Sequence, residues 1–231
     1  MALTIHYRLS LAAASYSHVQ RLLKALRKEA VQLGFSRVGH LQKLGEPALV
    51  RDPDQPGVTH AIDPIVALGF RTWPSEGEAE ASFGLSRYPA AVLRKDGASF
   101  PTGLPLWCSR GFCSTGTADD EQHGGVVNFV RCHIGVVALL EAAARMGFRV
   151  EVLDDAAYWE TRDVLALARN ARKHIELMAV FAATMYELSQ DHGDLIEAIG
   201  VQDSSLSKVF KLIWLTRSRG PGRSSEAESY L

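Results

Sequence analysis

The chain lacks the features that define secreted and membrane proteins. Its 231 residues contain three cysteines, an odd number that does not suit the disulfide framework of a secreted protein, so we expect reduced thiols. Charged residues break the apolar runs before the roughly 18 residues that a membrane-spanning helix needs. No basic segment followed by an apolar one opens the chain. A cytoplasmic protein without a membrane partner is therefore expected.

The chain also lacks an excess of charge of either sign. It has 25 Lys and Arg residues against 26 Asp and Glu residues. This balance provides no general attraction to nucleic acid, so we expect no nucleic-acid partner. The first helix carries a basic stripe, but amphipathic surface helices commonly do; its residues are Arg21, Lys24, Arg27 and Lys28.

No catalytic signature is present. The chain contains no Gly-x-Ser-x-Gly elbow, no Walker loop, no His-Glu-x-x-His and no Cys followed after five residues by Arg. The function must therefore be inferred from individual side chains and their surroundings.

What is present is a clear pattern of strands and helices. Residues 3–11 alternate between apolar and polar, which predicts a half-buried strand. A helix is expected from Ser17, capped with Gln20, to Gly34. Asp96-Gly97 predicts a hairpin between two apolar runs. Further strands are expected at 35–41, 65–70, 81–88 and 148–153, helices at 125–146 and 156–188, and loops at 42–60 and 101–124.

This order predicts an α+β fold. Consecutive strands favour a largely antiparallel or mixed sheet, here of about five or six strands, packed against two or three long helices at 17–33, 125–146 and 160–188. We expect one domain over residues 1–190. A weakly helical extension over 191–216 and a disordered tail over 217–231 should follow, because the tail has almost nothing to bury.

The helix at 125–146 carries polar side chains on both of its faces. His133 lies in the middle of a broad apolar face, while Asn128 and Arg131 share a narrower face with small residues. Neighbours on both sides are therefore expected to cover the helix. Buried polar groups need partners, so His133 is first interpreted as a core histidine bonded to one carbonyl group.

The three cysteines and His133 leave two other interpretations open. Cys108 and Cys113 are spaced C-x4-C, and with Cys132 or His133 they could complete a tetrahedral zinc site. Two observations argue against a zinc site: the wide spacing of Cys108 and Cys113, and the adjacency of Cys132 to His133. Alternatively, Cys113 could be a nucleophile ahead of a helix, with His133 as its base.

An acidic and aromatic segment follows the strand at 148–153. Acids in a first helical turn oppose the helix dipole, which is one explanation for Asp155 and its neighbours. The alternative is a polar site in which Trp159 forms a wall and Arg162 holds an anion. Glu160 and Asp163 would belong to the same site.

Three segments resemble a family of uncharacterised bacterial proteins. They are Phe112-Cys113, the run GGVVNFVRCH from Gly124 to His133, and YWETRD from Tyr158 to Asp163. The resemblance covers residues 107–168 well and the N-terminal half loosely. It implies a bacterial origin and a shared architecture, but no activity and no catalytic residue.

These observations favour a non-catalytic binding or accessory protein. Its ligand or protein partner would lie against segments 107–133 and 158–163, through Trp107, Asn128, Arg131, Trp159, Glu160, Arg162 and Asp163. No cofactor is expected under this interpretation. The competing interpretation is a zinc protein or a thiol-dependent enzyme that uses Cys113 and His133.

Overall fold

The computed structural model of the chain describes residues 3–12, 14–76, 79–115 and 124–191. The chain divides into two units, Met1–Arg172 and Lys173–Leu231. The features below belong to the first unit, and the described part of the second is the end of helix α4 (Val164–Asp191). The extension and tail expected after residue 191 lie outside the described residues.

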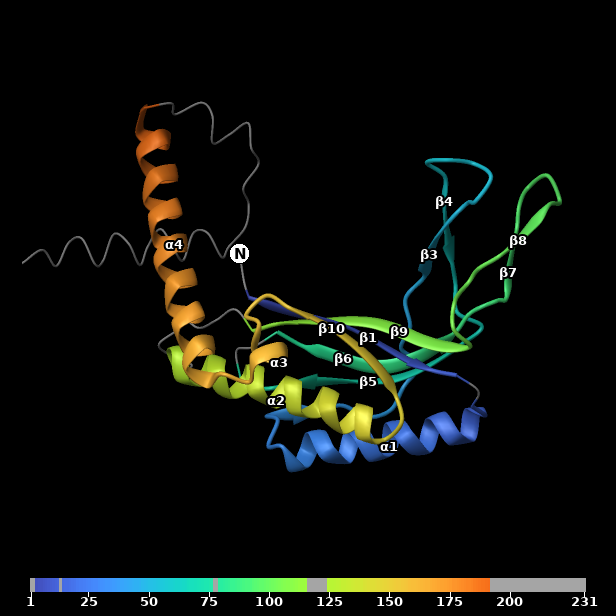
Figure 1. Cartoon of the computed structure of the whole chain (residues 1–231), viewed down its shortest axis with the longest axis horizontal. Helices are drawn as coiled ribbons and strands as arrows, with labels where there is room; N and C mark the ends of the chain where they lie inside the picture. The colour runs from blue at the N-terminus through green and yellow to red at the C-terminus, as the bar shows by residue number, and fades with distance from the viewer. Residues whose placement is uncertain (1–2, 13, 77–78, 116–123, 192–231) are drawn as a thin grey trace, which may run out of the picture. The chain divides into compact units, whose positions relative to one another are not determined.

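A six-stranded antiparallel sheet forms the centre of the first unit, which confirms the α+β prediction (Figure 1). The strand order is β10-β1-β9-β6-β5-β2. The strands are β1 (Thr4–Leu11), β2 (Arg37–Val38), β5 (Val66–Trp73), β6 (Ala81–Arg87), β9 (Trp107–Ser114) and β10 (Arg149–Asp154). Each pair of neighbouring strands in this sheet is antiparallel, as expected when strands follow one another along the chain.

Two long helices, α1 (Tyr16–Gln32) and α2 (Gly125–Arg145), lie on the same side of the sheet (Figure 1). The alternation of β1 buries Ile5, Tyr7 and Leu9. The small residues of α2 let its neighbours approach closely, since a Cβ at Gly135 would lie 3.1 Å from the ring of Phe35. Neighbours therefore cover α2 on both faces, as its sequence predicts.

The length and composition of α2 would also allow it to cross a membrane, and no other described helix shares this property. Its buried side chains nevertheless belong to the core. Phe129, Val136 and Leu140 are fully buried. The pattern is that of a helix packed inside a protein, so the membrane-like composition reflects burial on both faces.

Tyr7 of β1 is accommodated by a glycine on the next strand. Gly111 of β9 is its register partner, and a Cβ at Gly111 would lie 2.5 Å from the Tyr7 ring. The ring is held in this place, because its hydroxyl donates to the carbonyl oxygen of Ser82 at 2.8 Å and it stacks on Phe83 at 5.1 Å. Burial raises the pKa of the Tyr7 phenol.

We expect Gly111→Ala to lower the free energy of unfolding by about 1–3 kcal/mol, the usual cost of overpacking a core. The new methyl group would displace the Tyr7 ring from its hydrogen bond and its stack. Urea unfolding measures the loss. In a Tyr7→Leu background the same change should cost clearly less. An equal cost in both backgrounds would show that the clash is not with Tyr7.

Two hairpins outside the main sheet were only partly predicted. The pair β7 (Ala91–Leu93) and β8 (Ser99–Pro101) confirms the Asp-Gly signal, with Gly97 at φ 85°. The pair β3 (Ala48–Arg51) and β4 (Thr59–Ile62) corrects the prediction that 42–60 is a loop. The prolines and glycines that suggested a loop leave only four-residue strands free of them.

A small apolar cluster and an ion pair join the two hairpins. Val50, Val92 and Phe100 form the cluster. Arg94 donates to both carboxylate oxygens of Asp52, at 2.7 and 2.5 Å, and His60 lies 3.1 Å from the same carboxylate. The hydrogen bonds from Arg94 hold the pKa of Asp52 well below its usual range, although burial opposes them. Charge and contact together thus set the position of each hairpin against the other.

Three other sequence predictions need correction. The expected loop at 101–124 contains β9. Its pattern is hidden because Ser109 and Gly111 occupy positions that face the helices, while Phe112 faces outward. The first helix is capped by Ser15, whose side chain accepts from the His18 amide at 3.2 Å, and not by Ser17. The helix expected at 156–188 is interrupted at Arg162, which has φ 56°. Among the described residues, the long helices packed on the sheet are α1 and α2, and the expected third helix is divided into α3 (Tyr158–Thr161) and α4.

Candidate functional site

One end of the sheet collects several buried polar residues, among them Asn128 and His133, which the sequence singled out. Strands β5, β9 and β10 run in the same direction, so they finish at the end of the sheet where β1 and β6 begin. Ser75, Thr115 and Asp154 come at or just after these strand ends. Helix α2 brings Asn128 and His133 to them, as the hydrogen bonds below demonstrate.

His133 is fully buried between a hydroxyl and a carboxylate. Its Nδ1 lies 3.0 Å from Thr115 Oγ1, and its Nε2 lies 3.0 Å from Asp154 Oδ2. The imidazole Nε2–H donates to the Asp154 carboxylate. The side chain therefore has two partners, which confirms a core position but replaces the single carbonyl partner that we expected.

Asp154 receives further donors from the turn that follows it. Its Oδ2 accepts the Trp159 amide and its Oδ1 accepts the Ala156 amide, each at 2.9 Å. Burial alone would raise the pKa of Asp154, but the hydrogen bond and charge of His133 and the two amides outweigh it, so the pKa lies below the ordinary value. The carboxylate thus connects β10, α2 and α3.

Thr115, His133 and Asp154 provide a hydroxyl, an imidazole and a carboxylate, the groups that make up a nucleophilic triad. However, Thr115 and His133 both have 0% exposure, so in this structure solvent does not reach either group. Thr115 Oγ1 also lies 3.3 Å from the Leu3 carbonyl oxygen, which gives it a second structural partner. We therefore interpret these hydrogen bonds as structural: they hold α2 to the sheet.

A second polar group lies on the other side of α2 from His133. Asn128 is 8% exposed, and its Nδ2 donates to Ser75 Oγ at 2.8 Å. Its Oδ1 accepts from a terminal nitrogen of Arg131 at 2.9 Å. Asn128 therefore fixes the Arg131 guanidinium relative to the end of β5. Within the described part of the chain, Arg131 forms no ion pair with a carboxylate.

Asn128 and Arg131 line a cavity of about 370 Å³. Its other lining residues come from the segments after α1 and β5, and the lining is mostly polar; they are Gly34, Ser36, Pro74, Ser75 and Glu76. Its charges are the guanidinium of Arg131 and the carboxylate of Glu76. This volume suits a small metabolite.

Most of the side chains of the turn after β10 already contact other residues of the protein. Arg162 pairs with Glu141 of α2 at 2.6 Å, and its guanidinium lies 4.6 Å from the centre of the Trp159 ring. Asp163 caps α4 by accepting the Ala166 amide at 2.9 Å. Glu160 is exposed. These residues therefore lie near Asp154 but do not line the polar cavity.

All three cysteines are buried, Cys108 and Cys113 on β9 and Cys132 on α2. Cys108 and Cys113 are five residues apart on a strand, so their side chains point to opposite faces of the sheet. Burial raises the pKa of the Cys108 thiol. In the described segments, no three His, Cys, Asp or Glu side chains gather closely enough to hold a metal ion.

Trp107 lies at the opposite end of β9 from Thr115. Its side chain is 1% exposed, and its indole nitrogen donates to the Ala14 carbonyl oxygen at 2.9 Å. This bond ties the link between β1 and α1 to the sheet. The structure therefore brings Asn128 and Arg131 together at the cavity, but places Trp107 in the core.

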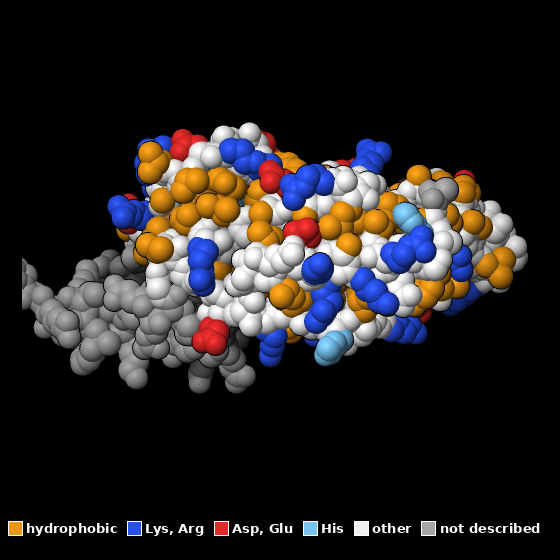
Figure 2. All heavy atoms as spheres, turned by 90° about the horizontal axis from the view of Figure 1, so that it is seen from below, with side chains coloured by type: hydrophobic (Ala, Val, Ile, Leu, Met, Phe, Trp, Pro, Cys, Tyr) orange, Lys and Arg blue, Asp and Glu red, His pale blue; other side chains and the backbone are white. Residues whose placement is uncertain are grey.

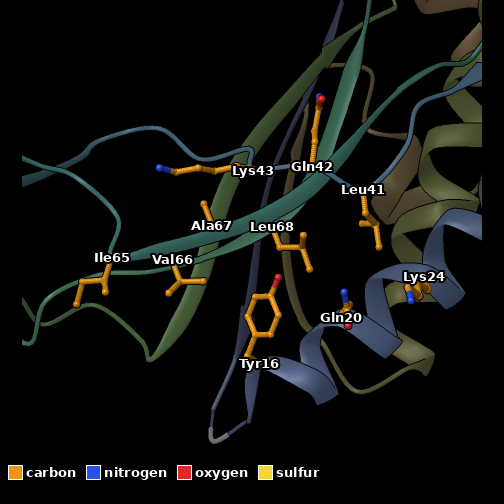
Figure 3. Close-up of a pocket in the computed structure, with 10 residues that line it drawn as sticks. All are labelled: Tyr16, Gln20, Lys24, Leu41, Gln42, Lys43, Ile65, Val66, Ala67 and Leu68. Atoms are coloured by element: carbon orange, nitrogen blue, oxygen red, sulfur yellow. The ribbon is translucent and has the colours of Figure 1, made fainter.

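A larger cavity, of about 540 Å³, lies between α1 and the start of β5 (Figure 3). Tyr16, Gln20 and Lys24 line it from successive turns of α1, and Leu41 and Leu68 belong to its apolar side. Lys43 also lines it but points away from Tyr16. Its polar side chains are Tyr16, Gln20, Lys24, Gln42 and Lys43, and among the described residues no hydrogen bond joins any two of them, in contrast to Asn128 and Arg131.

The side of the molecule that α1 covers carries scattered Lys and Arg side chains and few acidic ones (Figure 2). The basic stripe predicted from sequence accounts for part of this. Arg21, Lys24 and Lys28 are exposed, but Arg27 donates to the Gly39 carbonyl oxygen at 2.6 Å. One member of the stripe thus joins α1 to the segment after β2.

Sequence reasoning missed Ser36, Ser75, Glu76 and Thr115. Ser75 and Glu76 lie between two strands, and nothing local distinguishes a serine there that bonds to a distant asparagine. Asn128 itself was the available signal, because a buried amide on a helix requires partners.

Comparison of the chain with protein family models, curated proteins and solved structures finds no match. This outcome agrees with a resemblance to a family that has no assigned activity. The geometry of the site is therefore the basis for the function.

Proposed function

We propose that the protein is a non-catalytic binding protein for a small carboxylate-bearing molecule, held in the polar cavity by Arg131. The observation that carries the proposal is a guanidinium without an ion-pair partner among the described residues, fixed by a buried amide at the wall of that cavity. Arginine binds carboxylates through parallel N–H donors, and fixing it beforehand reduces the entropy lost on binding.

The charge of the cavity narrows the class of ligand. Glu76 also lines the cavity, and its negative charge is opposite in sign to that of Arg131. A doubly charged anion would be repelled there, while a molecule with one carboxylate and one ammonium or hydroxyl group would satisfy both side chains. The hydroxyls of Ser36 and Ser75 already donate to the carbonyl oxygens of Trp73 and Glu76, so they add only acceptor positions for a ligand. Amino acids and small hydroxy acids fit this description.

The proposal predicts that Arg131→Gln weakens binding by about 10- to 100-fold, the usual effect of losing a charge-assisted hydrogen bond. Thermal shift with a panel of amino acids, hydroxy acids and inorganic phosphate identifies the ligand, and calorimetry measures its affinity. Arg145→Gln is the matched control, since Arg145 is an exposed arginine in the last turn of the same helix.

Asn128→Asp provides a second test with little change of shape. It would place a carboxylate beside Arg131 and neutralise the charge that the ligand needs. We expect it to weaken binding as much as Arg131→Gln. Binding that survives both changes would mean that the ligand lies elsewhere.

The competing interpretation, a zinc protein or a thiol enzyme, lacks a comparable observation. Its two residues, Cys113 and His133, are both fully buried, and His133 is bonded on both ring nitrogens.

A further inference from the structure

The face of the sheet away from α1 and α2 carries exposed aromatic and basic side chains on β10, β1 and β9. Phe112 is 61% exposed and Leu153 is 66% exposed. Both are register partners of His6, which is exposed between them. The rings of His6 and Phe112 lie 6.2 Å apart and are tilted by 36°. A row of apolar and aromatic groups thus crosses three strands on a face that water reaches.

The next row on the same face is basic. Arg8 lies directly opposite Arg110 in the register of β1 and β9, and Glu151 lies opposite Arg8 on β10. Glu151 is 3.8 Å from Arg8 and 3.0 Å from Arg149, so a single carboxylate faces two arginines. Arg110 forms no ion pair within the described residues.

Like charges directly opposite one another on a sheet destabilise it. An anion that contacts both Arg8 and Arg110 would remove this repulsion. The same charges oppose a second copy of the chain on this face, because two such surfaces would place arginines against arginines. The occupant should therefore combine anionic groups with flat rings that stack on Phe112 and His6.

We propose that this face binds single-stranded nucleic acid. Bases stack on exposed aromatic side chains, and phosphates pair with nearby arginines, so one strand would satisfy both rows. The neutral total charge argued against a nucleic-acid partner, but that argument averages over the whole surface. The local composition of this face is Arg8, Arg110 and Arg149 against Glu151 and Asp155, beside two rings.

The spread of these side chains over three strands favours a polymer over a free nucleotide. The rows lie on neighbouring strands of one sheet, and each offers only a few contacts. A polymer makes several such contacts at once, which raises the effective concentration of each.

Fluorescence anisotropy with a labelled uridine oligonucleotide tests the proposal, using the full chain. We expect Phe112→Ala to weaken binding by about 5- to 100-fold, the range for loss of one stacked base. Phe112→Tyr should retain most of the affinity. Arg110→Gln should lower the slope of log affinity against log salt by about 0.7, while Lys28→Gln, the same change of charge on α1, should leave the Phe112-dependent binding in place.

Several outcomes would overturn the proposal. These are no binding of the oligonucleotide, unchanged binding by Phe112→Ala, equal binding of duplex, and displacement by poly-glutamate as readily as by unlabelled oligonucleotide. The last result would indicate an acidic protein partner. Arg131→Gln should bind the oligonucleotide normally, so failure here and failure of the small-molecule proposal are distinguishable.

Discussion

Replacement of Asp154 by alanine should lower the free energy of unfolding by about 3–5 kcal/mol, the usual cost of removing one partner of a buried charged pair. The carboxylate has 0% side-chain exposure and accepts from His133 and from the amides of Ala156 and Trp159. Without it, three donors at the end of the sheet lose their acceptor. Urea unfolding at neutral pH measures the effect.

Asp155→Ala is the matched control. Asp155 is the next residue, it is exposed, and its side chain accepts one amide, from Thr4 at 3.2 Å. Its removal should cost no more than about 1 kcal/mol. If the two variants lost the same stability, the bonds around His133 would not hold α2 to the sheet.

The same carboxylate predicts a dependence on pH. The pKa of Asp154 in the folded protein is lower than its ordinary value, so the unfolded chain takes up a proton first as pH falls. Its contribution is complete above the ordinary pKa of about 3.9 and declines as pH falls toward the folded value. The wild type should therefore lose stability more steeply below about pH 4 than Asp154→Asn does.

Phe83→Ala should also cost about 3–5 kcal/mol, the range for deleting a fully buried ring. Phe83 has 0% exposure and lies between two rings on the helix-covered face, Tyr7 at 5.1 Å and Phe70 at 5.8 Å. Deletion leaves a cavity in the stack that connects β1, β6 and β5. Chemical unfolding followed by tryptophan fluorescence measures the loss.

Phe112→Ala makes the same chemical change on the opposite face of the sheet. Because Phe112 is 61% exposed, its removal should change stability by less than about 0.5 kcal/mol. Similar losses for the two variants would contradict the assignment of the two faces. The result also establishes whether Phe112→Ala is suitable for the oligonucleotide experiment.

The parts of the fold that could be predicted have regular local patterns. The alternation of β1 and the long apolar face of α2 are properties of neighbouring residues, so the sequence is enough to find them. Strand β9 was missed because it contains Gly111, a residue untypical of strands. Gly111 makes room for the ring of Tyr7, which lies over a hundred residues earlier. The break at Arg162 was missed because no glycine or proline marks it.

Only the part of the candidate site that lies on α2 could be predicted from the sequence. Asn128 and Arg131 stood out as polar residues on a helix that had to be covered. Ser75, the partner of Asn128, comes from a turn 53 residues away, and only the strand order brings it to the helix. His133 was singled out and Asp154 belongs to the acidic segment after the strand at 148–153, but their contact depends on β10 pairing with β1 at the edge of the sheet.

Titration of the protein followed by the guanidinium NMR signal of Arg131 tests the proposed function most directly. Amino acids and small hydroxy acids are added one at a time, and Arg145 serves as the internal reference. We predict that at least one compound shifts the Arg131 signal saturably while the Arg145 signal stays in place, and that Asn128→Asp abolishes the shift. If no compound moves Arg131 more than Arg145, the polar cavity is not a binding site for this class of molecule.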